Sequence, residues 1–221
     1  RGSYVKVLIS GASGLIGTEL AKQLSALGHK PIRLVRRPVK SADEMFWAPG
    51  ISDLDPNSLS DIDAVINLAG ATTGKIPWTK KYERELISSR LDSTKTLVDA
   101  INACPNPPKV LISGSASGIY GDQSDAWLDE SSPKGEGFLA DLAYKWEEAA
   151  KLAKTRVVLV RTTMVMSKKL GALGKLLPLI KLGIGGALGS GKQWWAWISL
   201  EDQARAIIHL IENESTSGAY N

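Results

Sequence analysis

Cysteine and histidine are nearly absent from this chain of 221 residues. The one cysteine, Cys104, excludes an intramolecular disulfide and a paired redox site, because both need two thiols. With only two histidines, His29 and His209, any metal site would have to be built mainly from carboxylates, so we expect no metal. These shortages exclude disulfide-stapled, cysteine-rich zinc-binding and thiol-redox classes of protein.

Long apolar runs and a strong charge excess are missing as well. The sequence shows no charged-then-apolar leader and no apolar run of membrane-spanning length, so we expect a cytoplasmic protein without a membrane partner. Lysine and arginine number 27 against 23 acidic residues, a net charge of +4 that is spread along the chain and disfavours a nucleic-acid partner. We expect one domain over residues 4–221, interpret residues 1–3 as a cloning remnant, and leave the oligomeric state open.

What the chain does contain is an alternation of short apolar runs with helical stripes. This order predicts an α/β fold with a doubly wound parallel sheet, because parallel strands need helical crossovers. The expected strands lie at 5–9, 32–35, 64–68, 110–113 and 156–161, and the expected helices at 16–27, 79–103 with a break, 138–153 and 199–212.

The first strand is followed by three glycines, Gly11, Gly14 and Gly17, directly before a helix. In such a turn the first glycine permits the tight bend, the second lets main-chain N–H groups approach a pyrophosphate, and the third lets the helix meet the strand closely. The phosphates then lie at the positive end of the helix. The spacing therefore predicts a dinucleotide site, with a ligand-free glycine-rich turn as the alternative.

Two arginines, Arg36 and Arg37, end the second strand about twenty residues after the last glycine. A protein that binds NAD through its ribose hydroxyls has a carboxylate there, because hydroxyls need an acceptor. Two fixed cations instead fit the 2'-phosphate of NADP. We therefore predict NADP as the cofactor, the alternative being a pair of surface arginines.

These residues, together with INLAGA (66–71), WTKKYERELISSRLDST (78–94), SGSASGIYG (113–121) and the closing GAYN, resemble the extended short-chain dehydrogenase/reductase superfamily, in its atypical epimerase-like subfamily. The resemblance covers nearly the whole chain. It implies a Rossmann-type sheet with NADP across the carboxyl ends of the strands. It also implies that family members continue past GAYN, so that a C-terminal substrate portion is expected to be truncated here.

The resemblance assigns cofactor contacts to further positions. Ser13, Leu15 and Ile16 join the three glycines around the pyrophosphate, and Leu68, Ala69 and Gly70 form the segment that passes the adenine ribose. Glu85 and Arg90 match cofactor-proximal helix positions, for which a helical surface ion pair is the alternative.

The Tyr-x-x-x-Lys motif that reductases and epimerases of this superfamily use for proton transfer is absent from the chain. Phe138 and Leu142 occupy roughly its two positions. The remaining catalytic candidates are Ser115, to orient a substrate oxygen, and Tyr120, to act as the acid. The alternative for Tyr120 is a packing role at a strand-loop corner, with its hydroxyl bonded to backbone.

These features favour an NADP(H)-dependent oxidoreductase that acts on an unidentified small molecule. A sugar-nucleotide epimerase and a non-catalytic NADP(H)-sensing regulator remain as alternatives, since the missing motif would be no loss to a sensor. A separate feature is the crowding of Trp194, Trp195 and Trp197 before the last helix. For them we predict an edge strand of the sheet, in preference to a surface that stacks on a flat substrate.

Overall fold

The computed structural model describes residues 4–167, 171–186 and 189–221. Seven strands form one sheet, and every neighbouring pair in it is parallel. The strand order is β3-β2-β1-β4-β5-β6-β9, with bounds β1 Lys6–Ser10, β2 Lys30–Val35, β3 Glu44–Phe46, β4 Ala64–Asn67, β5 Val110–Ala116, β6 Arg156–Thr162 and β9 Gly218–Tyr220. The predicted doubly wound, Rossmann-like parallel sheet is confirmed.

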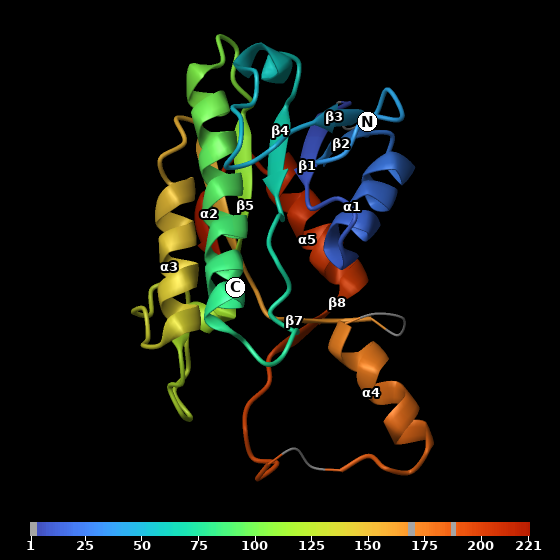
Figure 1. Ribbon diagram of the computed structural model, residues 1–221, viewed down its shortest axis with the longest axis vertical. Coiled ribbons are helices and arrows are strands. Elements are labelled where there is room, and N and C mark those ends of the chain that lie inside the picture. The colour runs from blue at the N-terminus through green and yellow to red at the C-terminus, as the bar shows by residue number, and fades with distance from the viewer. Residues whose placement is uncertain (1–3, 168–170, 187–188) are drawn as a thin grey trace.

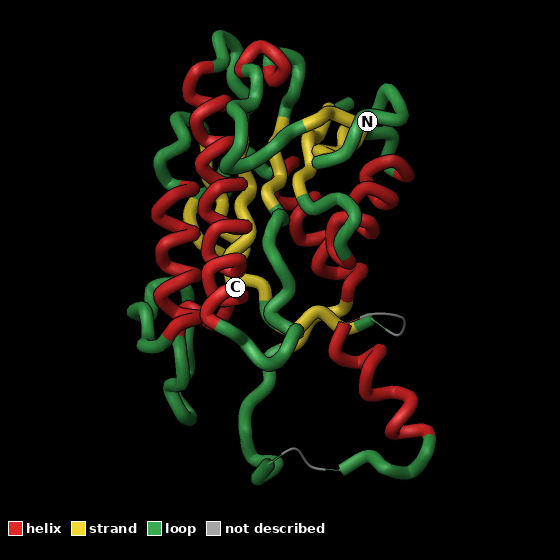
Figure 2. Tube along the Cα trace, viewed as in Figure 1, coloured by secondary structure: helices red, strands yellow, loops and turns green. Residues whose placement is uncertain are grey.

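Helices cover both faces of the sheet, in two pairs (Figures 1 and 2). On one face α1 (Leu15–Ala26) packs against α5 (Leu200–Glu212), and on the other α2 (Lys80–Ala103) packs against α3 (Phe138–Ala150). Two short 3-10 turns, η1 (Pro56–Leu59) and η2 (Ser117–Tyr120), precede β4 and follow β5. Because both faces are covered, the central strands are apolar almost throughout.

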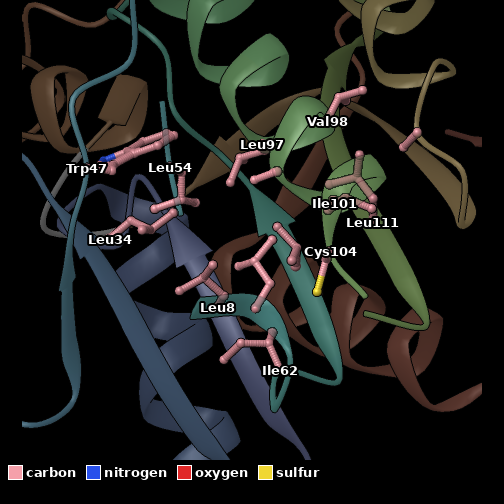
Figure 3. Packing of buried hydrophobic residues seen from close by; sticks show 14 of the residues in the cluster. Leu8, Leu34, Trp47, Leu54, Ile62, Leu97, Val98, Ile101, Cys104 and Leu111 are labelled. Atoms are coloured by element: carbon pink, nitrogen blue, oxygen red, sulfur yellow. The ribbon is translucent and has the colours of Figure 1, made fainter. Parts of the chain in front are cut away.

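A separate hydrophobic core lies on each face. Figure 3 shows the α2 side, where Leu97 and Ile101 of the helix meet Leu8 and Leu111 of the central strands. The opposite core joins α1 and α5 to the other faces of the same strands. The central strands therefore have almost no exposed side chains, which fixes their register and the positions of the loops that follow them.

Helix α2 is continuous over 24 residues, so the predicted break in it was wrong. The polar residues near its middle do not interrupt it, because their hydroxyls bond to carbonyls one turn back. Ser93 Oγ donates to Ser89 O at 2.7 Å and Thr94 Oγ1 donates to Arg90 O at 2.7 Å. Helix α5 begins as predicted at Ser199, whose Oγ accepts from Asp202 N at 3.0 Å.

The strand predicted around the three tryptophans forms only from Trp197 onward, and it is not an edge of the main sheet. The outer position next to β6 is taken by β9, whose residues belong to the closing GAYN. The strand that contains Trp197 is β8 (Trp197–Ser199), which pairs with β7 (Met164–Met166) in a second, two-stranded sheet. Helix α4 (Gly171–Lys181), which lies between β7 and β8 in the sequence, extends away from the main sheet (Figure 1).

Candidate cofactor site

The turn between β1 and α1 has no room for side chains at two of its glycines. Gly11 has φ +67°, and a Cβ there would lie 2.5 Å from Leu68 O. A Cβ on Gly17 would lie 2.4 Å from Gly11 O, so the first turn of the helix sits directly on the loop. Gly14 N donates to Gly11 O at 2.9 Å and closes the turn. The backbone is therefore bare where β1 meets α1.

Helix α1 begins at Gly14 without a side-chain cap and without an acidic residue in its first turn. By contrast, Thr79 caps α2 by accepting from Tyr82 N at 3.2 Å. Leu15, Ile16 and Gly17 form the uncapped turn, and their N–H groups have no partner within the helix. The positive end of the helix dipole and these N–H groups together favour an anion.

A cavity of about 1240 Å³ opens beside this turn. It lies at the carboxyl ends of β1, β2 and β4, next to the point where the strand order reverses, which is the usual ligand site of such sheets. Nine of the predicted cofactor residues belong to its wall: Gly11, Ser13, Gly14, Arg36, Arg37, Leu68, Ala69, Gly70 and Glu85. The other four, Leu15, Ile16, Gly17 and Arg90, are not part of the wall.

The segment after β4 is held in place by a buried polar chain that sequence reasoning missed. Ser10 Oγ accepts from Leu68 N at 3.1 Å and from Ala69 N at 3.2 Å, and donates to Asn67 Oδ1 at 2.7 Å. Asn67 Nδ2 in turn donates to Thr94 Oγ1 at 2.9 Å. The signal in the sequence was a polar residue closing each of two apolar strands. These bonds fix the backbone that forms one wall of the cavity.

The arginines at the end of β2 differ in how they are paired. Arg37 forms a bidentate pair with Glu44, with Nη1–Oε2 at 2.9 Å and Nη2–Oε1 at 2.6 Å. Hydrogen bonds from Arg37 and from the backbone N of Lys40 lower the pKa of Glu44 to about 2, so the pair is ionised at any ordinary pH. Arg33 is paired with Asp43 at 2.9 Å. Among the described residues Arg36 has no carboxylate within ion-pair distance, and it is exposed on the cavity wall.

Arg90 is half-buried and lies against the segment after β4. A Cβ on Gly70 would lie 3.1 Å from its Cζ, and its guanidinium stands over the ring of Trp146 at 5.2 Å. Burial lowers the pKa of Arg90. Arg90 Nη1 donates to Leu86 O at 3.1 Å, and no ion pair with Glu85 is formed in the part of the chain that the structure describes. The surface ion pair considered for these two residues is therefore not what the structure shows.

Ser115 and Tyr120, the predicted catalytic residues, lie in a buried network outside the cavity wall. Ser115 Oγ donates to Glu147 Oε1 at 2.6 Å. Glu147 forms a bidentate ion pair with Arg161, at 2.8 and 3.0 Å, and Arg161 Nη1 donates to the Tyr120 hydroxyl at 2.8 Å. That hydroxyl donates to Asn221 Oδ1 at 2.6 Å, so its partners are side chains and not the backbone.

The ion pair in this network is almost completely buried, with 2% of the Glu147 side chain exposed. Burial acts to raise the pKa of Glu147, but hydrogen bonds from Arg161 and Ser115 outweigh it and hold that pKa below its usual range. The same pair raises the pKa of Arg161. Both groups are therefore charged at neutral pH, and the network links β5, α3 and β6 with the end of the described chain.

Other classes of site are not found in the part of the chain that the structure describes. It contains no group of three or more histidine, cysteine, aspartate or glutamate side chains placed to hold a metal ion. Nor does any helix within the described ranges have the length and apolar character needed to cross a bilayer.

A profile of the NAD dependent epimerase/dehydratase family matches residues 7–221. The chain belongs to this family. The epimerase family protein ML0860 of Mycobacterium leprae is 39% identical over 218 residues, which are 97% of this chain and 70% of that protein. The human epimerase family protein SDR39U1 is 37% identical over 224 residues, which are 98% of this chain and 74% of that protein.

Two solved structures resemble the chain over nearly its whole length. Human SDR39U1 isoform 2, solved with NADPH, has a TM-score of 0.87 at 33% identity and covers 98% of this chain and 73% of its own. A nucleoside-diphosphate sugar epimerase from Corynebacterium glutamicum has a TM-score of 0.88 at 32% identity and covers 100% of this chain and 46% of its own. The expected kinship with epimerase-like dehydrogenases is confirmed.

Proposed function

We propose that this protein binds NADP(H) in the cavity beside Gly11–Gly14 and acts as an oxidoreductase on a small carbonyl compound. The observation that supports NADP over NAD is Arg36, an exposed cation on the cavity wall without a carboxylate partner among the described residues. An arginine that is buried or paired with a carboxylate would be a poor phosphate ligand, because its guanidinium is inaccessible or already bound to another group. The human relative solved with NADPH supports the same choice.

Each part of the cavity has a task in this proposal. The uncapped N–H groups of α1 hold the pyrophosphate, and the backbone of Leu68–Gly70, fixed by Ser10, packs against the adenosine ribose. Arg36 binds the 2'-phosphate. NADPH bound there would supply the hydride for reduction of a carbonyl group to an alcohol, with the proton supplied from the protein side.

For the proton we propose Tyr120, with Ser115 orienting the substrate oxygen. Tyr120 donates its hydroxyl hydrogen to Asn221 Oδ1, so this role requires a substrate oxygen to replace Asn221 as the acceptor. Arg161 keeps the phenol oxygen in place from the other side at 2.8 Å. In the family motif a lysine cation stands near the tyrosine, and here an arginine does.

A specific observation favours a second candidate, an NADP(H)-binding sensor without catalysis. Ser115 and Tyr120 are both buried and both bonded within the protein. In a sensor they would only stabilise the fold near the cofactor. The catalytic machinery would then be absent and not merely rearranged.

The test is turnover with NADPH and a panel of carbonyl compounds, measured by loss of absorbance of the reduced cofactor. Turnover that Tyr120→Phe abolishes, while NADPH affinity stays unchanged, supports the oxidoreductase. Tight NADPH binding without turnover on any compound favours the sensor. Cofactor-dependent interconversion of a sugar nucleotide, with no net oxidation of NADPH, would show an epimerase.

A further inference from the structure

Five of the seven tryptophans gather at one end of the molecule. Trp78 follows β4 and Trp127 follows β5, while Trp194 and Trp195 precede β8 and Trp197 is its first residue. The carboxyl ends of parallel strands lie at one edge of the sheet. Because β7 follows β6 directly and pairs with β8, the last three tryptophans lie beyond that same edge. The other two tryptophans, Trp47 and Trp146, are buried, with 4% and 7% of each residue exposed.

Hydrogen bonds of Trp194 and Ala196 hold the tryptophan stretch against the rest of the protein. Trp194 Nε1 donates to Asp125 Oδ1 at 2.7 Å, in the loop after β5. Thr163 Oγ1, between β6 and β7, donates to Ala196 O at 2.6 Å. These bonds bring residues from three distant parts of the sequence together at the edge of the sheet that carries the cofactor cavity.

The rings themselves remain in solvent. Trp127, Trp194, Trp195 and Trp197 are 101%, 79%, 50% and 65% exposed. Large apolar side chains gathered on a surface mark a place where something binds, since isolated exposure is common but clustered exposure is not. Small-molecule sites are lined mainly by aromatic and apolar side chains, and these four rings are of that kind.

We propose that Trp127, Trp194, Trp195 and Trp197 form the substrate-binding surface, and that it takes a planar, uncharged aromatic carbonyl compound. This inference rests on the proposed NADP(H)-dependent reduction and names its substrate class. A planar compound follows from the rings, because aromatic faces stack best on flat aromatic partners. The position follows from the sheet, because these tryptophans and the cofactor cavity both lie beyond the carboxyl ends of its strands.

The loop that carries Trp127 indicates that the substrate is uncharged. Residues 121–137 contain five acidic side chains and one lysine, and Asp125 is the group that holds Trp194. A diphosphate placed against this loop would meet like charges, which costs binding energy. A sugar nucleotide therefore suits this surface less well than a neutral ring.

The test compares two vicinal dicarbonyl compounds by calorimetric titration into the protein saturated with NADP+. Isatin carries the dicarbonyl on a flat aromatic ring, and 2,3-butanedione carries it without one. We expect isatin to bind more tightly and Trp195→Ala to weaken isatin about 2- to 12-fold, the range for the loss of one aromatic contact. Trp195→Phe, which keeps a flat ring, should stay near the unmodified protein. Leu152→Ala, a 70% exposed apolar residue just after α3, is the matched surface control.

Several results would overturn the proposal. The proposal is wrong if Trp195→Ala and Leu152→Ala bind isatin with the same affinity. It is also wrong if UDP-glucose displaces isatin and binds more tightly than isatin does. A dimer of the unmodified protein that Trp195→Ala converts to monomer would assign the surface to a second copy of the chain. A titration with NADP+ alone distinguishes failure of the tryptophan surface from failure of the proposed function. Normal NADP+ binding with no dependence on tryptophan defeats only this surface, whereas failure of NADP+ to bind defeats the proposed function and the surface with it.

Discussion

Arg36 and Arg37 stand next to each other, but their substitutions should have different consequences. Arg37 is held by Glu44 in a bidentate pair, and the low pKa of Glu44, about 2, keeps that pair ionised in any binding buffer. Arg36 has no such partner among the described residues and faces the cavity. Replacement of Arg36 by serine should therefore remove the contact with the 2'-phosphate, while replacement of Arg37 should mainly release Glu44.

The size of the effect follows from the strength of a charged hydrogen bond. Such bonds contribute about 1.5 to 3 kcal/mol, and an exposed guanidinium belongs at the lower end because water and salt screen it. The lower figure corresponds to about a 10-fold change in dissociation constant. We expect Arg36→Ser to weaken NADPH about 10-fold and to leave NADH unchanged, and Arg37→Ser to have a smaller effect on NADPH.

Isothermal titration of each variant with NADPH and with NADH measures both numbers. The difference between the cofactors should shrink as salt is raised from 0.05 to about 0.5 M, because the contact is exposed and the screening length falls to a few ångströms. Equal losses for NADPH and NADH in Arg36→Ser would refute the reasoning. A larger loss in Arg37→Ser than in Arg36→Ser would move the phosphate contact to the paired arginine.

Two further predictions concern the β1–α1 turn and the buried ion pair. Gly28, which follows the C-terminus of α1 and is not part of the cavity wall, serves as the control: it has φ +84° with nothing within 4 Å of an added Cβ, so Gly28→Ala should lower the free energy of unfolding by about 1 to 2 kcal/mol and leave NADPH affinity unchanged. Gly11→Ala imposes the same positive-φ strain and also places a Cβ 2.5 Å from Leu68 O. It should therefore lower the free energy of unfolding more than Gly28→Ala does, and weaken NADPH binding as well. Glu147→Gln should lower the unfolding free energy by about 3 to 5 kcal/mol at pH 7, because it leaves Arg161 buried without its counter-charge. Since the folded pKa of Glu147 is depressed, this difference should be full above about pH 4.3, the unfolded value, and fall as the pH drops through the folded pKa.

Denaturant unfolding measures the stabilities. Equal destabilisation by the two glycine variants would show that strain, and not the close approach to Leu68, dominates at Gly11. A Glu147→Gln difference that is the same at pH 7 and pH 3 would show that the carboxylate charge contributes nothing.

The sheet, its core and the β1–α1 turn were predictable because their signals are local. Apolar runs mark strands covered on both faces, and three glycines at fixed spacing mark a turn that leaves no room for side chains. The strands β3, β7 and β9 were not predicted, since three residues carry too little pattern to be recognised.

The pairing of individual side chains could not be predicted from the sequence. Arg37 meets Glu44 only because β3 runs beside β2, and Arg161 meets Glu147 only because α3 packs over β5 and β6. Sequence spacing shows neither contact. The two arginines at the end of β2 therefore look equivalent in the sequence, although only Arg36 is left without a carboxylate among the described residues.

The central claim is that bare backbone at the start of α1 and one unpaired arginine together hold NADP(H). Calorimetric titration of the unmodified protein with NADPH, and in parallel with NADH, tests it most directly. We predict saturable binding at one molecule per chain, with NADPH tighter by about 10-fold or more. No saturation with NADPH or NADP+, or equal affinity for NADPH and NADH, would contradict the account.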